Sequence, residues 1–431
     1  MSEQKNYRFE TLQLHAGQES PDPATGARCV PVYQTAAYVF ENTAQAEARF
    51  ALAEPGNIYS RLTNPTLDIF ERRMAALEGG VAALATASGA AAITYAVQNI
   101  AHAGDHIVSS QSVYGGTYNL FAHTLTESGI ETTFVDGDSP EAFAAAIRPN
   151  TKAFFVESLG NPNSNVADIE RIAQIAHTNG IPLIVDNTFA TPVNCRPIEW
   201  GADIVTHSTT KYMDGHGATL GGAIVDGGKF DWMAHADKFP GLCTPDDSYH
   251  GITYAEHFGK EGAFITKATA QLMRDFGCVQ SPINAYMLNL GLESLHVRMA
   301  RHCENGQAVA EFLASHPKIA YVNYCGLPGD KYHAVAEKYL PNGSCGVVSF
   351  GVKGGREAAA AFMGHLKIAA IETHVADART CCLHPASSTH RQMNDEQLIA
   401  AGVQPDLVRM SCGLEDKNDL IHDIAQALDQ I

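Results

Sequence analysis

The sequence predicts an α/β protein in which a mostly parallel, wound β-sheet is preceded by an N-terminal arm and followed by a smaller C-terminal α+β domain. One observation is length, because 431 residues are too many for one small module and fit two or three domains. Another is composition, since 45% hydrophobic and 18% charged residues supply enough apolar material for a sizeable core. The third is an alternation of short apolar segments with helical patterns between residues 81 and 225. Such alternation is expected when helices cover both faces of a parallel sheet.

The chain begins with a segment that we expect to form an extended arm, residues 1–65. Turn-forming residues cluster at 21–26, and helical periodicity is weak. A helix is predicted from Thr66, because apolar residues recur on one face as far as Leu77 and a glycine pair at 79–80 ends the pattern. The arm therefore leads directly into the first helix of the sheet domain.

The central part of the chain predicts the strands and helices of the wound sheet. The strand candidates are short, apolar on both faces and rich in Val and Ile, which is typical of buried parallel strands. They are residues 81–86, 106–109, 132–135, 153–157, 183–186, 204–207 and 222–225. Most stretches between them carry helical periodicity, at residues 90–101, 117–127, 140–147 and 168–179.

The later part of the chain predicts a long loop and a second domain. Residues 233–256 are rich in Gly, Pro, Asp and aromatic residues, which indicates a long ordered loop of a kind that is often functional. Beyond it we expect helices at 263–276, 282–313, 356–366 and 419–428, with strands at 346–351 and 407–411. We therefore divide the chain into an arm (1–65), a large domain (66–282) and a C-terminal domain (283–431).

Charge and hydropathy exclude several classes of function. A formal net charge of −18 repels phosphodiester backbones, so we expect no nucleic-acid partner, and an anionic small substrate would need a local basic pocket. The sequence has no run of 18 or more apolar residues, and its first ten residues lack an apolar signal region. We therefore expect no membrane partner and a cytoplasmic location.

Common cofactor and metal motifs are absent from the sequence. The turn after the first predicted strand has a single glycine, Gly89, so it does not match the dinucleotide-binding GxGxxG, and neither a P-loop nor an HExxH occurs. We expect no metal site. The ten cysteines form no CxxC pair and are mostly expected to be small buried hydrophobic residues. Cys381 and Cys382 are adjacent, but a disulfide between them would be strained.

Three polar features follow predicted strands, which is where wound sheets bind their ligands. The serine of the pair at 88–89 is either an ordinary N-cap or part of a phosphate cradle of backbone N–H groups. Asp186 ends an apolar run and is either an N-cap or a placed charge. Lys211 comes after the next strand, beside Ser208 and Thr210, and is either a surface residue or a desolvated amine that forms a Schiff base.

A phosphate cradle, an acid and a lysine in this order match the requirements of pyridoxal 5′-phosphate (PLP). The lysine would hold the aldehyde as an imine, and the acid would keep the pyridine nitrogen protonated, so that the ring remains an electron sink. The glycine turn and the hydroxyls would hold the phosphate. PLP is therefore the cofactor that the sequence predicts.

Longer runs of residues resemble the Cys/Met-metabolism family of PLP enzymes, which are the trans-sulfuration enzymes. The runs are residues 59–66, 88–89, 113–117, 157–158, 161–162, 186–188, 208–212, 384–387 and 408–416. The resemblance covers about residues 8–430 and implies a PLP-dependent transferase of fold type I. Within the family it is greatest to the O-acetylhomoserine sulfhydrylases, through residues 11–18, 215–217, 228–232 and an insertion at 238–251.

The resemblance implies a role for each matching residue of the cofactor site. Lys211 would form the imine and later shuttle protons, and Asp186 would pair with the pyridinium. Tyr114, which in isolation would be an ordinary core tyrosine, would stack on the ring and act as an acid or base. The other cofactor-binding residues would be Tyr59, Arg61, Ser88, Gly89, Ala90, Asn161, Thr188, Ser208 and Thr210.

The resemblance also implies a substrate site and a second copy of the chain as partner. Arg409, which in isolation would be an ordinary surface arginine, would bind the α-carboxylate by bidentate pairing. Tyr59, Asn161 and Thr380 would complete the substrate site. Tyr59 and Arg61 would reach the phosphate of a neighbouring subunit, so a homodimer-based homotetramer is expected.

One segment departs from the family pattern near the substrate carboxylate. Ala376 stands where the family commonly has Gly, and Thr380 stands where it usually has Ser. Cys381 and Cys382 replace ordinary aliphatic residues. The departure bears on substrate and thiol preference but not on PLP chemistry.

The implied activity is γ-replacement, in which O-acetylhomoserine and sulfide give homocysteine and acetate, and methanethiol in place of sulfide gives methionine. A cystathionine γ-synthase or γ-lyase, including a methionine γ-lyase, is the nearer alternative, and a PLP-fold binding protein without turnover is the remote one. The sequence does not decide the sulfur donor, the acetyl or succinyl leaving group, the role of the Cys381–Cys382 pair, or dimer against tetramer.

Overall fold

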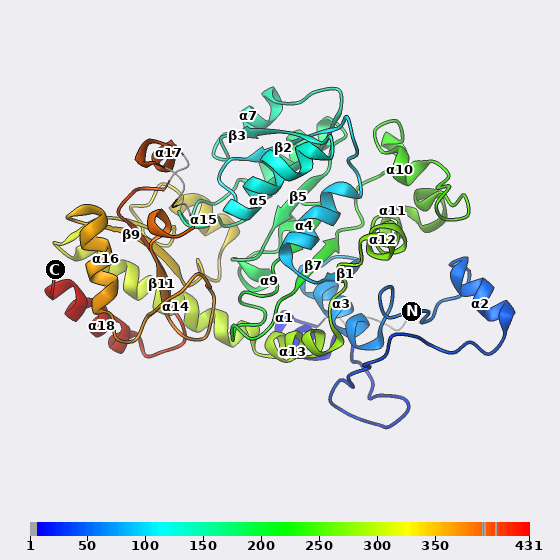
Figure 1. Cartoon of the computed structure of the whole chain (residues 1–431), viewed down its shortest axis with the longest axis horizontal. Helices are drawn as coiled ribbons and strands as arrows, with labels where there is room; N and C mark the ends of the chain where they lie inside the picture. The colour runs from blue at the N-terminus through cyan, green and yellow to red at the C-terminus, as the bar shows by residue number, and fades with distance from the viewer. Residues whose placement is uncertain (1–6, 390, 392–393, 401–402) are drawn as a thin grey trace.

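The computed structural model describes residues 7–389, 391, 394–400 and 403–431. Its large domain contains a seven-stranded sheet in the order β1-β7-β6-β5-β4-β2-β3 (Figure 1). The strands are β1 (Ala82–Thr86), β2 (His106–Ser110), β3 (Glu131–Val135), β4 (Thr151–Glu157), β5 (Leu183–Asp186), β6 (Ile204–His207) and β7 (Gly222–Asp226). All neighbours are parallel except β7, which is antiparallel to β1 and β6. The predicted mostly parallel sheet is therefore confirmed, and each of its seven predicted strands is present.

Two apolar clusters cover the two faces of this sheet. Successive strand residues point to opposite faces, so Phe154 lies in one cluster and Phe155 in the other. The first cluster includes Phe70 and Met74 of α3 (Pro65–Glu78), and the second includes residues of α4 (Gly89–Gln98) and α11 (Tyr254–Lys267). Each large side chain buried in this way contributes about 1.5–3 kcal/mol. The sheet is thereby fixed between two helical layers.

Helix α3 begins and ends where its sequence predicts. The Asn64 side chain caps the helix by accepting a hydrogen bond from the Thr66 backbone N–H at 3.0 Å, and Pro65 occupies the first turn. At the other end Gly79 has φ of 74°, a left-handed conformation that favours glycine and ends the helix. The first strand of the sheet therefore starts at a defined point.

The N-terminal arm contains two short helices that the sequence pattern did not predict. Helix α1 (Phe9–His15) buries Gln13, whose side-chain amide donates to the Glu293 carbonyl at 2.9 Å. Helix α2 (Thr43–Phe50) buries none of its residues and is capped by the Asn42 side chain. Local capping rather than an apolar face accounts for α2, which explains why periodicity did not reveal it. In Figure 1 the segment between these helices loops away from the sheet domain.

Short helices connect the strands, and two more interrupt the predicted loop at 233–256. Those between the strands are α5 (Gly115–Asn119), η1 (Leu120–Thr124), α6 (Leu125–Glu127), α7 (Pro140–Ala145), α8 (Ile169–Thr178), α9 (Thr191–Asn194) and η2 (Pro197–Trp200). Helices η3 (Met233–His235) and α10 (Pro240–Cys243) lie within the predicted loop. Helices η4 (Ala268–Met273) and α12 (Arg274–Phe276) follow α11. The loop is ordered around aromatic packing, because the Trp232 ring lies edge-on to Phe239 at 5.1 Å.

The later part of the chain begins with two helices and carries a second sheet. The predicted helix at 282–313 is broken at Ser294 into α13 (Pro282–Glu293) and α14 (Leu295–Ser315). The five-stranded sheet has the order β10-β11-β12-β9-β8, and all its pairs are antiparallel except β10 with β11. Its strands are β8 (Ile319–Asn323), β9 (Val347–Val352), β10 (Ala370–Ile371), β11 (Cys381–Leu383) and β12 (Leu407–Ser411). Its helices are α15 (His333–Tyr339), α16 (Gly355–His365), η5 (Pro385–Ser387), α17 (Asp395–Ala400) and α18 (Lys417–Asp429).

In the described part of the chain, no helix combines the length and the apolar character needed to cross a membrane.

Candidate active site

The turn after β1 forms a tight cradle before helix α4. Ser88 is the N-cap of this helix, and its hydroxyl accepts a hydrogen bond from the Ala91 backbone N–H at 3.2 Å. A Cβ atom at Gly89 would lie 2.6 Å from the Cβ and 2.8 Å from the Cα of Ser208, so the close approach of the two loops requires glycine. Ala90 follows in the first turn of the helix. The N-cap interpretation of Ser88 is thus correct, and the free N–H groups of the same turn suit a phosphate.

The loops after β5 and β6 are tied to each other beside this cradle. The Ser208 backbone N–H donates to the Thr188 hydroxyl at 2.8 Å, and the Thr188 N–H donates to an Asp186 carboxylate oxygen at 2.9 Å. The Thr210 hydroxyl accepts from the Gly221 N–H at 3.0 Å. The structure therefore brings Ser88, Gly89, Thr188 and Ser208 to one edge of the sheet.

Asp186 faces a second carboxyl group that the predictions did not include. Glu157 ends β4 directly beside Asp186 at the end of β5, and both are buried. Burial raises the pKa of Asp186, while burial and the neighbouring Asp186 raise the pKa of Glu157 to about 8. Two adjacent carboxyls do not both ionise readily, so Glu157 holds the proton and leaves Asp186 free to pair with a cation. Glu157 could have been found from the sequence, because it is an acidic residue at the end of a predicted apolar strand, as Asp186 is.

Glu157 also anchors two of the predicted cofactor residues. Its carboxyl accepts a hydrogen bond from the Tyr114 backbone N–H at 2.6 Å and another from the Asn161 backbone N–H. The Tyr114 side chain is 57% exposed and remains free to stack on a ligand. The side-chain oxygen of Asn161 is buried without a hydrogen-bond partner, which is an acceptor that a bound ligand can satisfy.

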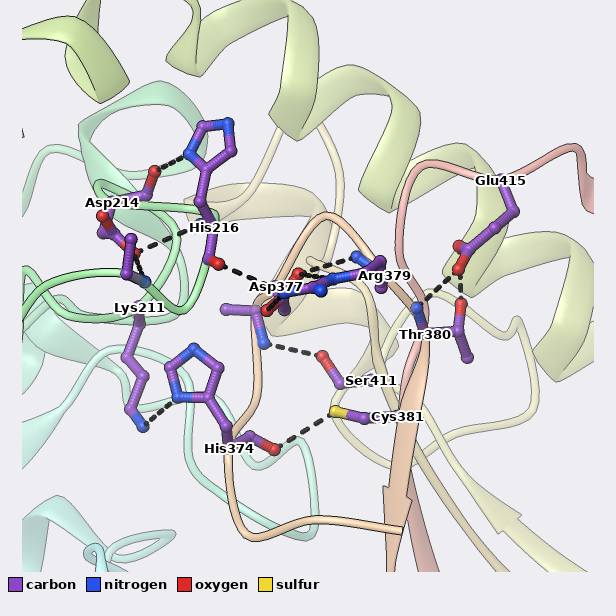
Figure 2. A network of polar contacts seen from close by, with 12 residues as sticks. Lys211, Asp214, His216, His374, Asp377, Arg379, Thr380, Cys381, Ser411 and Glu415 are labelled. Carbon is purple, nitrogen blue, oxygen red and sulfur yellow. Dashed lines mark hydrogen bonds and ion pairs between the residues drawn. The ribbon is translucent and has the colours of Figure 1, made fainter. Parts of the chain in front are cut away.

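Lys211 lies in the turn after β6, and its side chain points toward the C-terminal domain (Figure 2). Its Nζ atom is 3.4 Å from Nδ1 of His374. Burial, together with the positive charge of Arg409, lowers the pKa of Lys211 to about 8. About a tenth to a fifth of this amine is therefore neutral near physiological pH, and the neutral form is the one that attacks an aldehyde.

Arg409 approaches Lys211 from the other domain, on strand β12. One guanidinium nitrogen donates to the Thr373 carbonyl at 3.1 Å, while Nε is buried without a partner. Burial lowers the pKa of Arg409, and the nearby Tyr114 acts in the opposite direction. An anionic group of a ligand bound here would pair with the guanidinium charge and accept a hydrogen bond from its unused Nε–H.

The segment that departs from the family pattern is held by its own contacts. The Thr380 hydroxyl donates to Glu415 at 2.7 Å and accepts from the Gly413 N–H at 2.8 Å, so it is already engaged in holding the chain. The thiol of Cys381 donates to the His374 carbonyl at 3.2 Å. All ten cysteines, Cys382 included, are free thiols. Direct contact of Thr380 with substrate stays a prediction.

The two arm residues lie beside α12 of the same chain. The guanidinium of Arg61 is 5.3 Å from the centre of the Tyr59 ring, and both side chains are exposed. The Arg61 side chain passes close to Gly277 and carries its charge near Asp275. The structure thus groups these two residues with each other, and their service to a second subunit stays a prediction.

The residues at the sheet edge fit PLP. The unpartnered oxygen of Asn161 and the glycine-lined turn at Gly89 are features that such a ligand would fill, and Asp186 and Lys211 supply an anion and an amine. A wound sheet with these groups at its carboxyl edge is the arrangement found in PLP-dependent enzymes of fold type I, and this is the class to which the fold and the site point.

Comparison with known proteins identifies the family. The model of the Cys/Met metabolism PLP-dependent enzyme family matches residues 10–429. The chain is 50% identical to a homocysteine synthase of Schizosaccharomyces pombe, with 98% of each chain covered. It is 48% identical to an O-acetyl-L-homoserine sulfhydrylase of Leptospira meyeri, covering 99% of this chain and 98% of that protein. The chain belongs to the Cys/Met metabolism family of PLP-dependent enzymes.

A solved structure supports the same assignment. The crystal structure of a Campylobacter jejuni protein assigned as an O-acetylhomoserine (thiol)-lyase superposes with a TM-score of 0.94 at 40% identity. The match covers 98% of this chain and 100% of that chain, which carries an N′-pyridoxyl-lysine-5′-monophosphate. The predicted fold type is therefore confirmed over 98% of the chain.

Proposed function

We propose that this protein is an O-acetylhomoserine sulfhydrylase, which replaces the acetate on Cγ of O-acetylhomoserine by sulfide and releases homocysteine. Methanethiol in place of sulfide would give methionine. The observation that carries the proposal is the charge effect of Arg409 on Lys211, because it sets a partly neutral amine near a buried guanidinium that has an unused donor. Full-length relatives that carry this activity in their names, at 48 and 49% identity, support the choice within the family.

The cofactor would be held by the residues of the sheet edge. Its phosphate would take the N–H groups of the Ser88–Ala90 turn and the hydroxyls of Ser208 and Thr210. Asp186 would face the ring nitrogen, with Thr188 beside it, and Asn161 would face the ring oxygen. Tyr114 would cover the ring. When bound, PLP supplies an electron sink for carbanions next to the substrate nitrogen.

The protein's own residues then carry out binding and proton transfer. Arg409 would orient the substrate by its α-carboxylate, and Lys211 in its neutral form would remove the proton from Cα. A second proton is removed from Cβ, after which acetate leaves from Cγ. Hydrosulfide adds at Cγ, and protons return to Cβ and Cα. The atoms balance, since O-acetylhomoserine and hydrosulfide give homocysteine and acetate.

Within this proposal the working unit is a homodimer-based homotetramer in the cytoplasm, with Tyr59 and Arg61 serving a neighbouring subunit. The exposure of both side chains in the single chain supports a role outside it.

Turnover with defined substrates tests the function. The purified protein loaded with PLP is offered O-acetylhomoserine or O-succinylhomoserine, each with sulfide, methanethiol or cysteine, and the products are separated by chromatography. We expect homocysteine from O-acetylhomoserine and sulfide at the highest kcat/KM. Preference for cysteine as the thiol would indicate a cystathionine γ-synthase, and release of ammonia without added thiol would indicate a γ-lyase. The changed segment at 376–382 is the reason to compare all six combinations.

A further inference from the structure

A row of polar residues crosses the five-stranded sheet on the face opposite its apolar core. Asn323 on β8 is paired with Ser349 on β9, and Ser349 is paired with Arg409 on β12. Directly opposite residues of an antiparallel pair point to the same face, with Cβ atoms about 4.5–5.5 Å apart. The residues on either side of Ser349, Val348 and Phe350, lie in the apolar cluster on the other face. Asn323, Ser349 and Arg409 therefore form one polar row.

Two members of the polar row hold the loop that follows β4 of the other sheet. The Ser349 hydroxyl donates to the Pro162 carbonyl at 2.5 Å, and the Asn323 side-chain amide donates to the Asn163 side-chain oxygen at 3.3 Å. Ser349 has no exposed surface, so its hydrogen bond is shielded from water. The residue before Pro162 is Asn161, which the proposed function places against the cofactor. The polar row is thus tied to a loop of the cofactor site.

The loop after β4 is anchored at its base by its own backbone. Leu159 and Val166 form an antiparallel β-bridge there. The Gly160 N–H donates to the Asn165 carbonyl at 2.8 Å. These bonds close the base of the loop, and the polar row then holds its tip. The position of the tip therefore depends on the five-stranded sheet.

Arg409 and Asn161 come from different sheets, and each has a polar atom with unused hydrogen-bonding capacity. Nε of Arg409 and Oδ1 of Asn161 are both buried without a hydrogen-bond partner. An amino-acid substrate would lie between the guanidinium and the cofactor, so a change in the separation of these two residues would misplace its α-carboxylate. A displacement of about 1 Å is enough to cost a large factor in such a site. Ser349 is placed to set this separation, because it is the cross-strand neighbour of Arg409 and the hydrogen-bond partner of the Asn161 loop.

We propose that Ser349 is a positioning residue that fixes the separation of Arg409 and Asn161, and that this separation makes the site selective for amino acids over amines of the same length. This inference rests on the proposed function, because it takes the α-carboxylate as the group that Arg409 binds. Ser349 acts through its cross-strand neighbour and the Pro162 carbonyl and touches neither substrate nor cofactor. Asn323 has the same part with a longer hydrogen bond and a half-buried side chain, so its contribution is smaller.

A pair of ligands isolates the contribution of the carboxylate. L-Norvaline and butylamine differ only by this group, and each is titrated into the cofactor-loaded enzyme while the absorbance of the bound cofactor is followed. We expect Ser349→Ala to weaken binding of L-norvaline about tenfold and binding of butylamine less than about twofold. Unchanged affinity for L-norvaline, or an equal loss for both ligands, would overturn the proposal.

Two further variants complete this comparison. Asn323→Ala lies on the edge strand β8 and should fold even if Ser349→Ala does not; we expect it to weaken binding of L-norvaline about threefold, and no change would overturn the proposal. Ser109→Ala is the matched control, because Ser109 is equally buried and its hydroxyl donates to the carbonyl of its own neighbour, Ser110, at 3.0 Å. It should leave the ratio of the two affinities at the wild-type value. A change as large as that in Ser349→Ala would show that loss of any buried serine hydroxyl has this effect.

Amide hydrogen exchange tests the hold on the loop in the cofactor-free protein. The Gly160 and Ser164 N–H groups donate to carbonyls within the loop at 2.8 and 3.1 Å, so their exchange reports its opening. We expect these amides to exchange about tenfold faster in Ser349→Ala than in wild type, while the amides of α8 stay unchanged. Equal exchange of the loop amides in the two proteins would show that the Ser349 hydroxyl does not hold the loop, and this too would overturn the proposal.

The same experiments separate this inference from the proposed function. A wild-type enzyme that makes homocysteine and binds L-norvaline more tightly than butylamine upholds the function even if the variants behave like wild type. A wild type that shows neither property contradicts the function, and amide exchange in the cofactor-free protein then still tests the contact between Ser349 and the loop.

Discussion

Lys211 and Arg409 reach the site from different domains, and each has lost solvation in doing so. For the amine this loss favours the neutral, nucleophilic form, with a pKa of about 8. For the guanidinium it leaves a donor without a partner, and that donor can be satisfied by a carboxylate. The same burial that disfavours the charged amine and leaves the guanidinium short of a partner therefore prepares both groups for an amino-acid substrate.

Replacing Lys211 tests its role directly. We expect Lys211→Ala to abolish γ-replacement and to remove the absorbance band of the lysine imine, although PLP can still bind through its phosphate as the free aldehyde. Borohydride reduction of the wild-type enzyme, followed by peptide mapping, should place the pyridoxyl group on Lys211. A label on any other lysine would contradict the assignment.

Arg409 offers a test of substrate orientation. Arg409→Lys keeps the charge but loses the planar fork, so we expect kcat/KM for O-acetylhomoserine to fall by the equivalent of about 2–4 kcal/mol. The absorbance of bound PLP should be unchanged, which serves as the control for an intact site. Unaltered kcat and KM would remove Arg409 from the substrate site.

Glu157 gives a prediction about pH and stability. In the folded cofactor-free protein its pKa is raised from the ordinary value of 4.5 to about 8, so between these values the folded state holds a proton that the unfolded chain has released. This contribution to stability is complete below about pH 4.5 and is lost as the pH rises through about 8, at a rate of at most about 1.4 kcal/mol per pH unit.

Glu157→Gln mimics the protonated form and removes that dependence. Thermal unfolding of the cofactor-free proteins at pH 6 and pH 8 should therefore show a smaller loss of Tm in Glu157→Gln than in wild type. The exposed Glu127→Gln on α6 is the matched control and should follow wild type. An equal loss of Tm in all three proteins would show that Glu157 is ionised in the fold.

At the scale of elements, the turn between β1 and α4 is the part of the site with the least room for a larger side chain. A methyl group at Gly89 would press on the backbone of Ser208 at 2.8 Å, and overpacking of this kind costs about 1–3 kcal/mol. The turn must then open at the place where the phosphate would lie. We expect Gly89→Ala to weaken PLP binding about tenfold or more, measured by titrating the cofactor-free protein and following absorbance.

A second glycine provides the control for this element. Gly364 lies in α16 with no atom near the position of an added Cβ, so Gly364→Ala should leave PLP affinity unchanged and slightly stabilise the protein. Equal PLP affinity in Gly89→Ala and wild type would show that this turn does not carry the phosphate.

Elements with an apolar pattern were predictable from the sequence, and those without one were not. All seven strands of the large sheet and the caps of α3 follow from local residues, as does the order of Ser88, Asp186 and Lys211 along the chain. Strand β10 has two residues, both exposed, so no periodicity marks it. The break at Ser294 is preceded by Gly291 in the last turn of α13, but a single glycine inside an apolar helical pattern was not enough to predict a break.

Contacts between distant residues account for what local pattern could not reveal at the site. His374 meets Lys211 across 163 positions of the chain, and Glu157 meets Asp186 only because their strands are neighbours. The pattern around residues 376–382 showed a departure from the family, but it contained no sign that the Thr380 hydroxyl is engaged by Glu415. Tertiary pairing is needed for each of these statements.

At the scale of the whole molecule, the site joins residues that follow strands of the seven-stranded sheet to Arg409 on a strand of the five-stranded sheet. The Gly346 N–H donates to the Tyr212 hydroxyl at 2.9 Å, and the buried Arg298 donates to the Tyr212 carbonyl at 2.6 Å. Both contacts hold the residue that follows Lys211 against elements of the later chain. The position of the amine therefore depends on the packing of the two domains as well as on strand β6.

The proposed role of the N-terminal arm would make each site depend on a second copy of the chain as well. Tyr59 and Arg61 are exposed in the single chain, yet they belong to a run that matches the family. If the arm crosses to a partner, each site takes Arg61 from one chain and Lys211 from the other. Arg61 would then add positive charge to a phosphate that the helix N–H groups neutralise only in part.

Mixing two inactive variants tests this arrangement. Arg61→Ala and Lys211→Ala proteins are unfolded together and refolded, so that mixed dimers form, and γ-replacement is measured before and after. In a shared-site dimer one site of the mixed pair carries both changes and the other carries neither, so activity should reappear in the mixture at up to about half of the wild-type value per mixed dimer. If Arg61 serves the cofactor of its own chain, every site carries one defect and no activity returns. Native mass spectrometry confirms that mixed dimers are present, and their presence without recovered activity would rule out the shared site.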